Sequence, residues 1–130
     1  MTNVHQLPQT FALLTPALGI HPEACDAGLY ERLDRNYDDC KGATLVSCHA
    51  FSEDWGMWEL HPHGDELVML LDGHVTLVLR QDDGDKEVTL TEPLSYVIVP
   101  KNTWHTARTK VATRMVFVTP GEGTRNEVFD

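Results

Sequence analysis

The chain has 130 residues, 42% hydrophobic and 23% charged, and its formal net charge at pH 7 is −10 with histidine counted as neutral. This length and composition are typical of one globular domain and exclude a collagen, a coiled coil and a disordered chain. The acidic excess argues against nucleic-acid binding, which requires clustered lysine and arginine. The N-terminus has no basic start, and Pro16 interrupts its apolar part, so we expect neither a signal peptide nor contact with a membrane.

The cysteines point to a reducing compartment. Cys25, Cys40 and Cys48 are few, odd in number and contain no CxxC pair. This pattern is typical of reduced thiols that serve as small packing residues. Because disulfides are rare in the cytosol, we expect a cytoplasmic protein.

The first part of the chain predicts an extended arm and one helix. Residues 1–20 contain two prolines and read as the arm. The stretch near residues 22–35 is predicted to be a helix, since Pro22 suits a first helical turn and Leu29 and Leu33 share one side.

After Gly42 the sequence becomes rich in short β-type runs separated by turn residues, which predicts an antiparallel all-β domain. Asp83-Gly84 and Asp72-Gly73 are strong hairpin signals. We therefore divide the chain into an arm and helix over 1–41 and a β-barrel over 42–130, both parts of one domain. The predicted strands cover 43–51, 56–61, 66–71, 74–80, 86–91, 95–99, 104–109 and 113–119.

The run ELVMLL (66–71) is apolar on both faces. A strand of this kind needs a cover on its outer side, which the arm or a second subunit could supply. We therefore expect a homodimer with two-fold symmetry.

Ionisable residues cluster just before this run. Glu59, His61 and His63 share one face if their strand continues, Glu66 begins the next strand, and His105 begins a late one. Carboxylates and imidazoles inside a barrel are costly to bury unless they are paired. A divalent metal removes that cost, and this ligand set suits Zn, Fe, Mn, Ni or Cu.

The spacing of these residues resembles the two sequence motifs of small single-domain cupins. "GMWELHPHGDELVMLLDG" resembles the first motif and "LSYVIVPKNTWHTART" the second, in the right order and one short hairpin apart. The resemblance implies an all-β, jelly-roll-like barrel, the cupin double-stranded β-helix, with one short N-terminal helix. The matching residues are Gly56, His61, His63, Glu66, Gly73, Pro100 and His105.

The first motif departs from the family pattern, because only two residues separate His63 from Glu66 where the family has three or four. Two registers follow. In one, Glu59 replaces the first histidine and His61 fills the position of the second; in the other, His61 and His63 are both ligands. We prefer the first because it keeps the loop length. His61, Glu66 and His105 are ligands in both.

The second motif departs as well. Leu94, Asn102 and Thr109 stand where the family has glycine, glycine and asparagine.

Cupins include dioxygenases, isomerases, lyases, binding modules and regulators, so the resemblance does not define one activity. We expect a metal-dependent enzyme acting on a small polar substrate, with Glu59 or His63, whichever is not a ligand, as the general base. The alternatives are a non-catalytic small-ligand binding or sensor module, holding an anion through Lys101 or Arg108, and a metal-free cupin remnant. We expect a barrel mouth lined by Met57, Tyr96, Trp104, Met115 and Phe117, with Trp55 and Trp58 facing the other side or lying in a loop.

Overall fold

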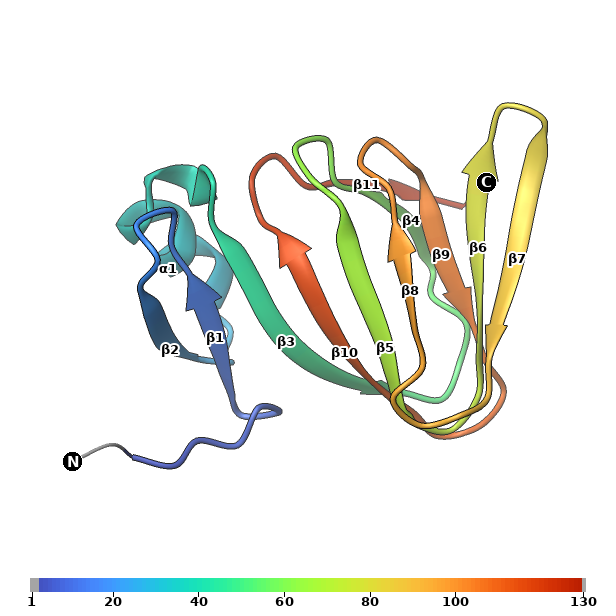
Figure 1. The fold of residues 1–130 in the computed structure, drawn as a ribbon, viewed down its shortest axis with the longest axis horizontal. Helices are drawn as coiled ribbons and strands as arrows, with labels where there is room; N and C mark the ends of the chain where they lie inside the picture. Colours follow the sequence, from blue (N-terminus) through green and yellow to red (C-terminus); the bar gives the residue numbers. More distant parts are fainter. Residues whose placement is uncertain (1–2, 130) are drawn as a thin grey trace.

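The computed structural model describes residues 3–129 and, within them, places eleven strands in two antiparallel sheets (Figure 1). The strands are β1 (Thr10–Leu14), β2 (Ile20–Ala24), β3 (Thr44–Phe51), β4 (Met57–Leu60), β5 (Glu66–Asp72), β6 (Val75–Gln81), β7 (Gly84–Leu90), β8 (Tyr96–Val99), β9 (His105–Arg108), β10 (Thr113–Pro120) and β11 (Arg125–Val128). Sheet A has the order β2-β1-β3-β10-β5-β8 and sheet B the order β11-β4-β9-β6-β7. Residues 1, 2 and 130, at the outer ends of the two predicted segments, lie outside the described residues.

All eight predicted strands are present as β3 to β10, so the predicted all-β fold is confirmed. Of the two predicted hairpins, Asp83-Gly84 is confirmed, because β6 and β7 pair directly with Gln81 opposite Gly84. The hairpin at Asp72-Gly73 is wrong, since β5 lies in sheet A and β6 in sheet B. The Asp72-Gly73 turn instead connects β5 of sheet A to β6 of sheet B. Gly73 has φ +93°, and an added Cβ would lie 2.4 Å from a backbone carbonyl oxygen, so this turn requires glycine.

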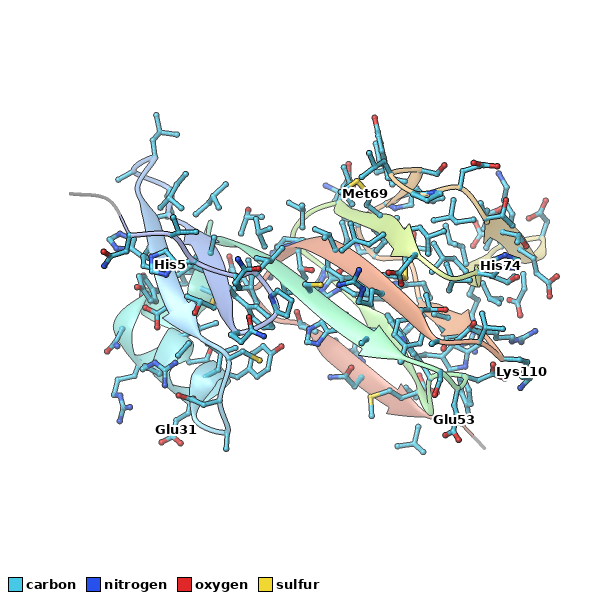
Figure 2. All side chains as sticks on the ribbon, turned by 90° about the horizontal axis from the view of Figure 1, so that it is seen from below. His5, Glu31, Glu53, Met69, His74 and Lys110 are labelled. Atoms are coloured by element: carbon cyan, nitrogen blue, oxygen red, sulfur yellow. The ribbon has the colours of Figure 1, made fainter. Side chains whose placement is uncertain are left out.

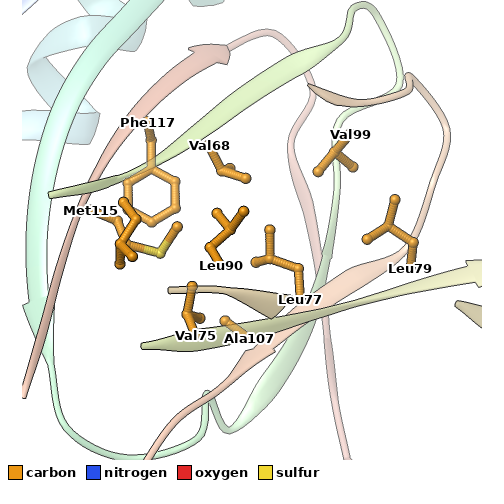
Figure 3. Close-up of a cluster of buried hydrophobic side chains, with 10 residues drawn as sticks. Val68, Val75, Leu77, Leu79, Leu90, Val99, Ala107, Met115 and Phe117 are labelled. Atoms are coloured by element: carbon orange, nitrogen blue, oxygen red, sulfur yellow. The ribbon is translucent and has the colours of Figure 1, made fainter. Parts of the chain in front are cut away.

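The main core fills the space between the two sheets (Figure 3). Strand alternation points Val68 and Leu70 of β5 toward Val75 and Leu77 of β6, and all four side chains are at most 1% exposed. Burying each such side chain stabilises the fold by roughly 1.5–3 kcal/mol.

The predicted helix over 22–35 is wrong in its first half. Residues Ile20–Ala24 form β2, and α1 spans only Leu29–Asn36, followed by a short 3₁₀ turn, η1 (Asp38–Cys40). The turn after β1 folds the chain back, with the Gly19 N–H donating to Thr15 Oγ1 at 3.0 Å. Pro22 is then accommodated because β2 is an edge strand, where a missing N–H leaves no ladder bond unmade.

A second hydrophobic core joins this N-terminal unit to the sandwich. Leu29 and Leu33 of α1 pack against Phe11 and Leu13 of β1, with Leu45 of β3 in the same cluster. Across the unit, Glu23 of β2 accepts hydrogen bonds from Arg32 Nε at 3.1 Å and Tyr37 Oη at 2.9 Å. The unit lies at the end of the molecule opposite β7, with α1 on the inner side of β1 and β2 (Figures 1 and 2).

The N-terminal arm does not cover the outer face of β5, which was one of the two covers expected from the sequence. β1 pairs with β3 of its own chain and does not cover β5, since β3 and β10 lie between them in sheet A. The outer face of β5 keeps half-buried apolar side chains, among them Met69, which projects away from the sandwich in Figure 2. Among the described residues, no helix has the length and apolar content needed to cross a membrane.

Candidate metal centre

Four ionisable side chains meet at one end of the sandwich. Glu59 lies in β4 and His61 directly after it, while Glu66 and His105 are the first residues of β5 and β9. β4 and β9 pair with Glu59 opposite His105, which brings the three segments to one edge. Each residue offers one ligand atom, and these atoms all lie within 4.8 Å of one another.

The contacts within this group, the Glu59–His61–Glu66–His105 quartet, are short. His61 Nε2 lies 2.8 Å from Glu59 Oε1 and 3.3 Å from Glu66 Oε2, and His105 Nε2 lies 3.0 Å from Glu66 Oε1. His61, Glu66 and His105 are at most 3% exposed, whereas the Glu59 side chain is 28% exposed. The quartet therefore has three buried members and one that faces the solvent-accessible side.

The hydrogen bonds around the quartet orient its members. His105 Nδ1 lies 3.0 Å from the Thr103 carbonyl oxygen, which can only accept, so Nδ1 carries the proton. In the neutral ring Nε2 then has a lone pair directed at Glu66, which also has only lone pairs to offer. The Thr119 hydroxyl donates to Glu66 Oε2 at 2.6 Å, and His61 Nδ1 lies 2.9 Å from Thr124 Oγ1.

Three buried atoms of the quartet lack a hydrogen-bond partner among the described residues: His61 Nε2, Glu66 Oε1 and His105 Nε2. Their mutual distances are short, but the directions required for hydrogen bonds are not met. Buried polar atoms without partners are rare and costly. A cation at the point where these lone pairs converge would satisfy them together, so the residues fit a metal ion.

Two nitrogen and two carboxylate donors without sulfur suit Zn, Fe, Mn, Ni or Cu better than Ca or Mg, which prefer sites made of oxygen alone. The hydrogen bonds to His105 and Glu66 are of the kind that orients metal-bound imidazoles and carboxylates.

The charges within the quartet shift the pKa values of His61 and Glu66 strongly. Burial lowers the pKa of His61, but the carboxylates of Glu59 and Glu66 close to its ring outweigh burial and raise it to about 9. Burial raises the pKa of Glu66, and the contacts with His105 and His61 outweigh this and lower it to about 2. Without a metal, a proton on His61 therefore supplies the positive charge that Glu66 requires.

His63 lies apart from the quartet. Its side chain is 55% exposed, and its Nε2 is 3.6 Å from Glu122 Oε2. The structure thus brings together the residues of the register that uses Glu59 and leaves His63 at the surface.

The departures in the second motif have local explanations. Leu94 and Asn102 have φ of 71° and 60°, the left-handed conformation that glycine adopts without strain. Asparagine tolerates this conformation, whereas leucine is strained in it by about 1–2 kcal/mol. Thr109 is buried and donates to the His74 carbonyl oxygen at 2.6 Å, which ties β9 to the turn that precedes β6.

A cavity of about 830 Å³ opens in front of the quartet. Glu59, His61 and Glu66 line it, and His105 lies behind them. Of the residues expected at the barrel mouth, Met57 and Phe117 line the cavity.

The expectation is wrong for Tyr96, Trp104 and Met115, which do not line this cavity. Tyr96 is 57% exposed and Met115 is fully buried. Trp104 packs under Arg125.

Trp55 was expected on the other side or in a loop; it lies in a loop, and its side chain lines the cavity. Trp58 packs against Phe129 and Arg80, as expected. The backbone N–H of Trp55 donates to the Ala107 carbonyl oxygen at 2.9 Å, which fixes the loop before β4 against β9. Strand alternation does not apply in a loop, so the sequence could not assign the direction of this side chain.

The opposite wall of the cavity comes from the N-terminal unit and was missed by sequence reasoning. Tyr30, Leu33 and Asp34 of α1 and Asp39 and Cys40 of η1 line it. No local signal in the sequence indicates this wall, because it depends on β1 pairing with β3 and carrying α1 to the mouth of the sandwich.

No family model matches the sequence, and no curated protein matches it. Similar solved structures exist. A cupin-2 domain protein from Shewanella frigidimarina is 17% identical with a TM-score of 0.50, covering 59% of this chain and 70% of that chain. A cupin superfamily protein from Desulfitobacterium hafniense is 22% identical with a TM-score of 0.50, covering 59% of this chain and 66% of that one.

Hydroquinone 1,2-dioxygenase from Sphingomonas, solved with 4-hydroxybenzoate bound, is 12% identical with a TM-score of 0.51, covering 62% of this chain and 60% of its own. At these identities the likeness shows the fold alone. Together with the two sheets and the ordered motifs, it shows that the chain has the cupin fold.

Proposed function

We propose that this protein is a metal-dependent enzyme of the cupin type. The observation that carries the proposal is the pairing of three buried, unpartnered ligand atoms with a cavity of about 830 Å³ in front of them. A purely structural metal site is closed by its ligands, whereas a catalytic site remains accessible to a substrate.

In this proposal His61, Glu66 and His105 hold a divalent metal ion, with Glu59 as the fourth member at the cavity face. When bound, such an ion supplies a Lewis acid that polarises a carbonyl group or activates water or oxygen. The hydrogen bond from His105 Nδ1 to Thr103 keeps Nε2 free to bind, and the Thr119 hydroxyl fixes the plane of the Glu66 carboxylate.

Glu59 is the residue we propose to contact the substrate. Its carboxylate is the most exposed of the quartet and lines the cavity. It can take a proton from a bound molecule while His61 remains within 2.8 Å of the same carboxylate. His63 is at the surface and outside the cavity lining, so we give it neither the ligand role nor the role of base.

The reaction class stays open among dioxygenase, isomerase and lyase, because one fold hosts many reactions. The two alternative functions expected from the sequence require different properties of the site. A binding or sensor module would hold its ligand without turnover, and a metal-free remnant would require hydrogen bonds to satisfy His61 Nε2 and His105 Nε2, which lack them here.

Turnover tests the proposal directly. Protein loaded with Fe, Mn, Zn, Ni or Cu is assayed for oxygen uptake and for isomerised or cleaved products, against a panel of small aromatic and polar substrates. We expect one metal form to turn over and Glu59→Gln to lose most of this activity, while His63→Ala retains it. A metal-loaded protein that binds panel members without converting any of them supports the binding module instead.

We also propose a homodimer formed through the outer face of β5 and β8. Ile98 and Tyr96 of β8 are 55% and 57% exposed, and Leu67 and Met69 of β5 beside them are half-buried. No charged side chain interrupts these four positions. A two-fold contact places the same patch against itself, so an uncharged apolar patch suits it.

The cytoplasmic location remains a prediction. Cys25, Cys40 and Cys48 are all free, and two of them are buried, which supports a reducing compartment. The exposed Cys25 does not fit the expectation that all three cysteines are packing residues.

A further inference from the structure

We infer that the cavity selects organic ligands that carry a cationic amino group on an aromatic or similarly apolar body, and that it disfavours carboxylates. This inference rests on the proposed function for the location of its site and specifies the substrate class. It follows from the charges and the shape of the wall that faces the quartet.

The cavity lining has acidic groups and no basic ones of the lysine or arginine type. Its carboxylates are Asp34, Asp39, Glu59 and Glu66. Every lining residue belongs to the described range 3–129, and none is lysine or arginine. The lining histidine outside the quartet, His49, has its pKa lowered by partial desolvation, which disfavours a positive charge there.

The acidic groups divide into two pairs with different roles. A divalent ion at the quartet would neutralise Glu66 and the Glu59 carboxylate beside it. Asp34 and Asp39 line the opposite wall, and neither forms an ion pair with another described residue. The wall formed by α1 and η1 therefore retains negative charge, which attracts an ammonium group and repels a carboxylate.

Aromatic rings form another part of the cavity lining. Trp55 lies 5.8 Å from both Phe51 and Phe117, measured between ring centroids, and all three line the cavity. Tyr30 of α1 adds a fourth ring on the side of the two aspartates. Such rings favour a flat apolar body and also attract cations at their faces. A cavity of about 830 Å³ is in the range that binds molecules larger than a simple diacid.

The two cations expected to hold an anion do not serve this cavity. Lys101 and Arg108 are absent from its lining. The Arg108 guanidinium lies 3.4 Å from Glu87 and borders a separate depression. An anionic ligand at the quartet would therefore have only the metal itself to neutralise it.

Three probes of matched size test the inference: 2-phenylethylamine, 2-phenylethanol and phenylacetate, which differ mainly in charge. Binding to the metal-loaded and the metal-free protein is measured by calorimetry at low ionic strength. We expect the amine to bind up to about fivefold more tightly than the alcohol, since an exposed ion pair contributes up to about 1 kcal/mol. Phenylacetate should bind most weakly to the metal-free protein, and added salt should reduce the advantage of the amine.

The double variant Asp34→Asn, Asp39→Asn should remove the preference for the amine and leave the affinity for the alcohol unchanged. Asparagine preserves the left-handed backbone of Asp39, whose φ is 54°. Asp38→Asn is the matched control, because Asp38 is in the same 3₁₀ turn but does not line the cavity.

The inference is wrong if phenylacetate binds the metal-free protein as well as the amine does, if none of the probes binds at millimolar concentration, or if the double variant keeps the preference. A protein that shows the preference but holds no metal and has no turnover contradicts the proposed function only. The two proposals can therefore fail separately.

Discussion

The two walls of the cavity differ in burial and in origin. On the sandwich wall, His61, Glu66 and His105 are at most 3% exposed, and the hydroxyl of Thr119 holds Glu66. On the wall made by α1 and η1, Asp34 and Asp39 are exposed and form no ion pairs with described residues. A buried, fixed group suits metal binding, and an exposed one suits selection of a ligand by charge. In the two proposals, the sandwich supplies the metal chemistry and the N-terminal unit supplies the selectivity.

Glu66→Gln should have the largest effect on the sandwich wall. It keeps the size of the side chain but removes the charge and one ligand oxygen of a residue that is 2% exposed. We expect metal affinity to fall by more than about 100-fold, beyond the effect of losing an outer hydrogen-bond partner. Calorimetric titration with Zn or Mn measures the change. If affinity stays within a few fold of the wild type, Glu66 is not a ligand.

Leu33→Ala should separate the two walls by loosening the N-terminal unit. Leu33 is 2% exposed in the second core and lines the cavity. Its truncation should cost about 2–5 kcal/mol of unfolding free energy, measured by urea denaturation, while metal affinity changes little. Leu18→Ala is the control, because Leu18 is 93% exposed. An equal loss of metal affinity in Leu33→Ala would show that the walls are not independent.

Thr119→Val tests how firmly the sandwich wall is held. Removing the hydroxyl that donates to Glu66 Oε2 at 2.6 Å leaves that carboxylate free to turn. Metal affinity should fall by about 10–100-fold, as for other partners that orient ligands. Thr119→Ser keeps the hydroxyl and should retain most of the affinity. Equal behaviour of the two variants would argue against an orienting role.

The pH dependence should have opposite signs with and without metal. In the metal-free protein, the raised pKa of His61, about 9, gives stability that is complete below about 6.5 and is lost as the pH rises through 9. The lowered pKa of Glu66, about 2, gives stability that is present above about 4.5 and is lost as the pH falls through 2.

Metal binding displaces the proton on His61, so metal affinity should instead rise by up to about tenfold per pH unit between 6.5 and 9. Thermal unfolding of the metal-free protein and metal titrations over the same pH range measure both trends. A metal affinity that is independent of pH across this range would show that no proton is displaced from His61.

Ile98→Glu should have the smallest effect, because the exposed Ile98 side chain lies on the face of the sheet opposite to buried Glu66. A charge at this position should convert the proposed dimer to monomers in light scattering and leave metal affinity unchanged. A wild-type protein that is already monomeric at micromolar concentration contradicts the dimer.

The two walls also differ in how well the sequence predicts them. All eight strands from β3 to β10 followed from local alternation and turn residues, and His61, Glu66 and His105 from motif spacing. The N-terminal unit did not follow, since Pro22 is as compatible with a first helical turn as with an edge strand. Only the pairing of β1 with β3, a contact between distant segments, decides between them.

Side-chain direction was predicted correctly at Glu59, but not at Tyr96 or Met115, although both of these lie in strands. Glu59 was expected beside His61 from strand alternation, and the two lie 2.8 Å apart. His63 and Trp55 lie in loops, where alternation does not apply. The sequence could not decide whether His63 is a ligand or where the Trp55 side chain points; in the structure His63 is at the surface and Trp55 lines the cavity.

The metal content of protein purified without a histidine tag or chelating resin tests the central claim most directly. Elemental analysis of the wild type, His105→Ala and His63→Ala, all prepared in parallel, should find close to one transition-metal ion per chain in the wild type and in His63→Ala. His105→Ala should be nearly empty while circular dichroism shows the same β-rich fold, because the substitution removes a ligand and leaves the hydrophobic core intact. Equal metal content in all three proteins, or no metal in the wild type even after incubation with each candidate ion, would contradict the claim that the quartet is a metal site.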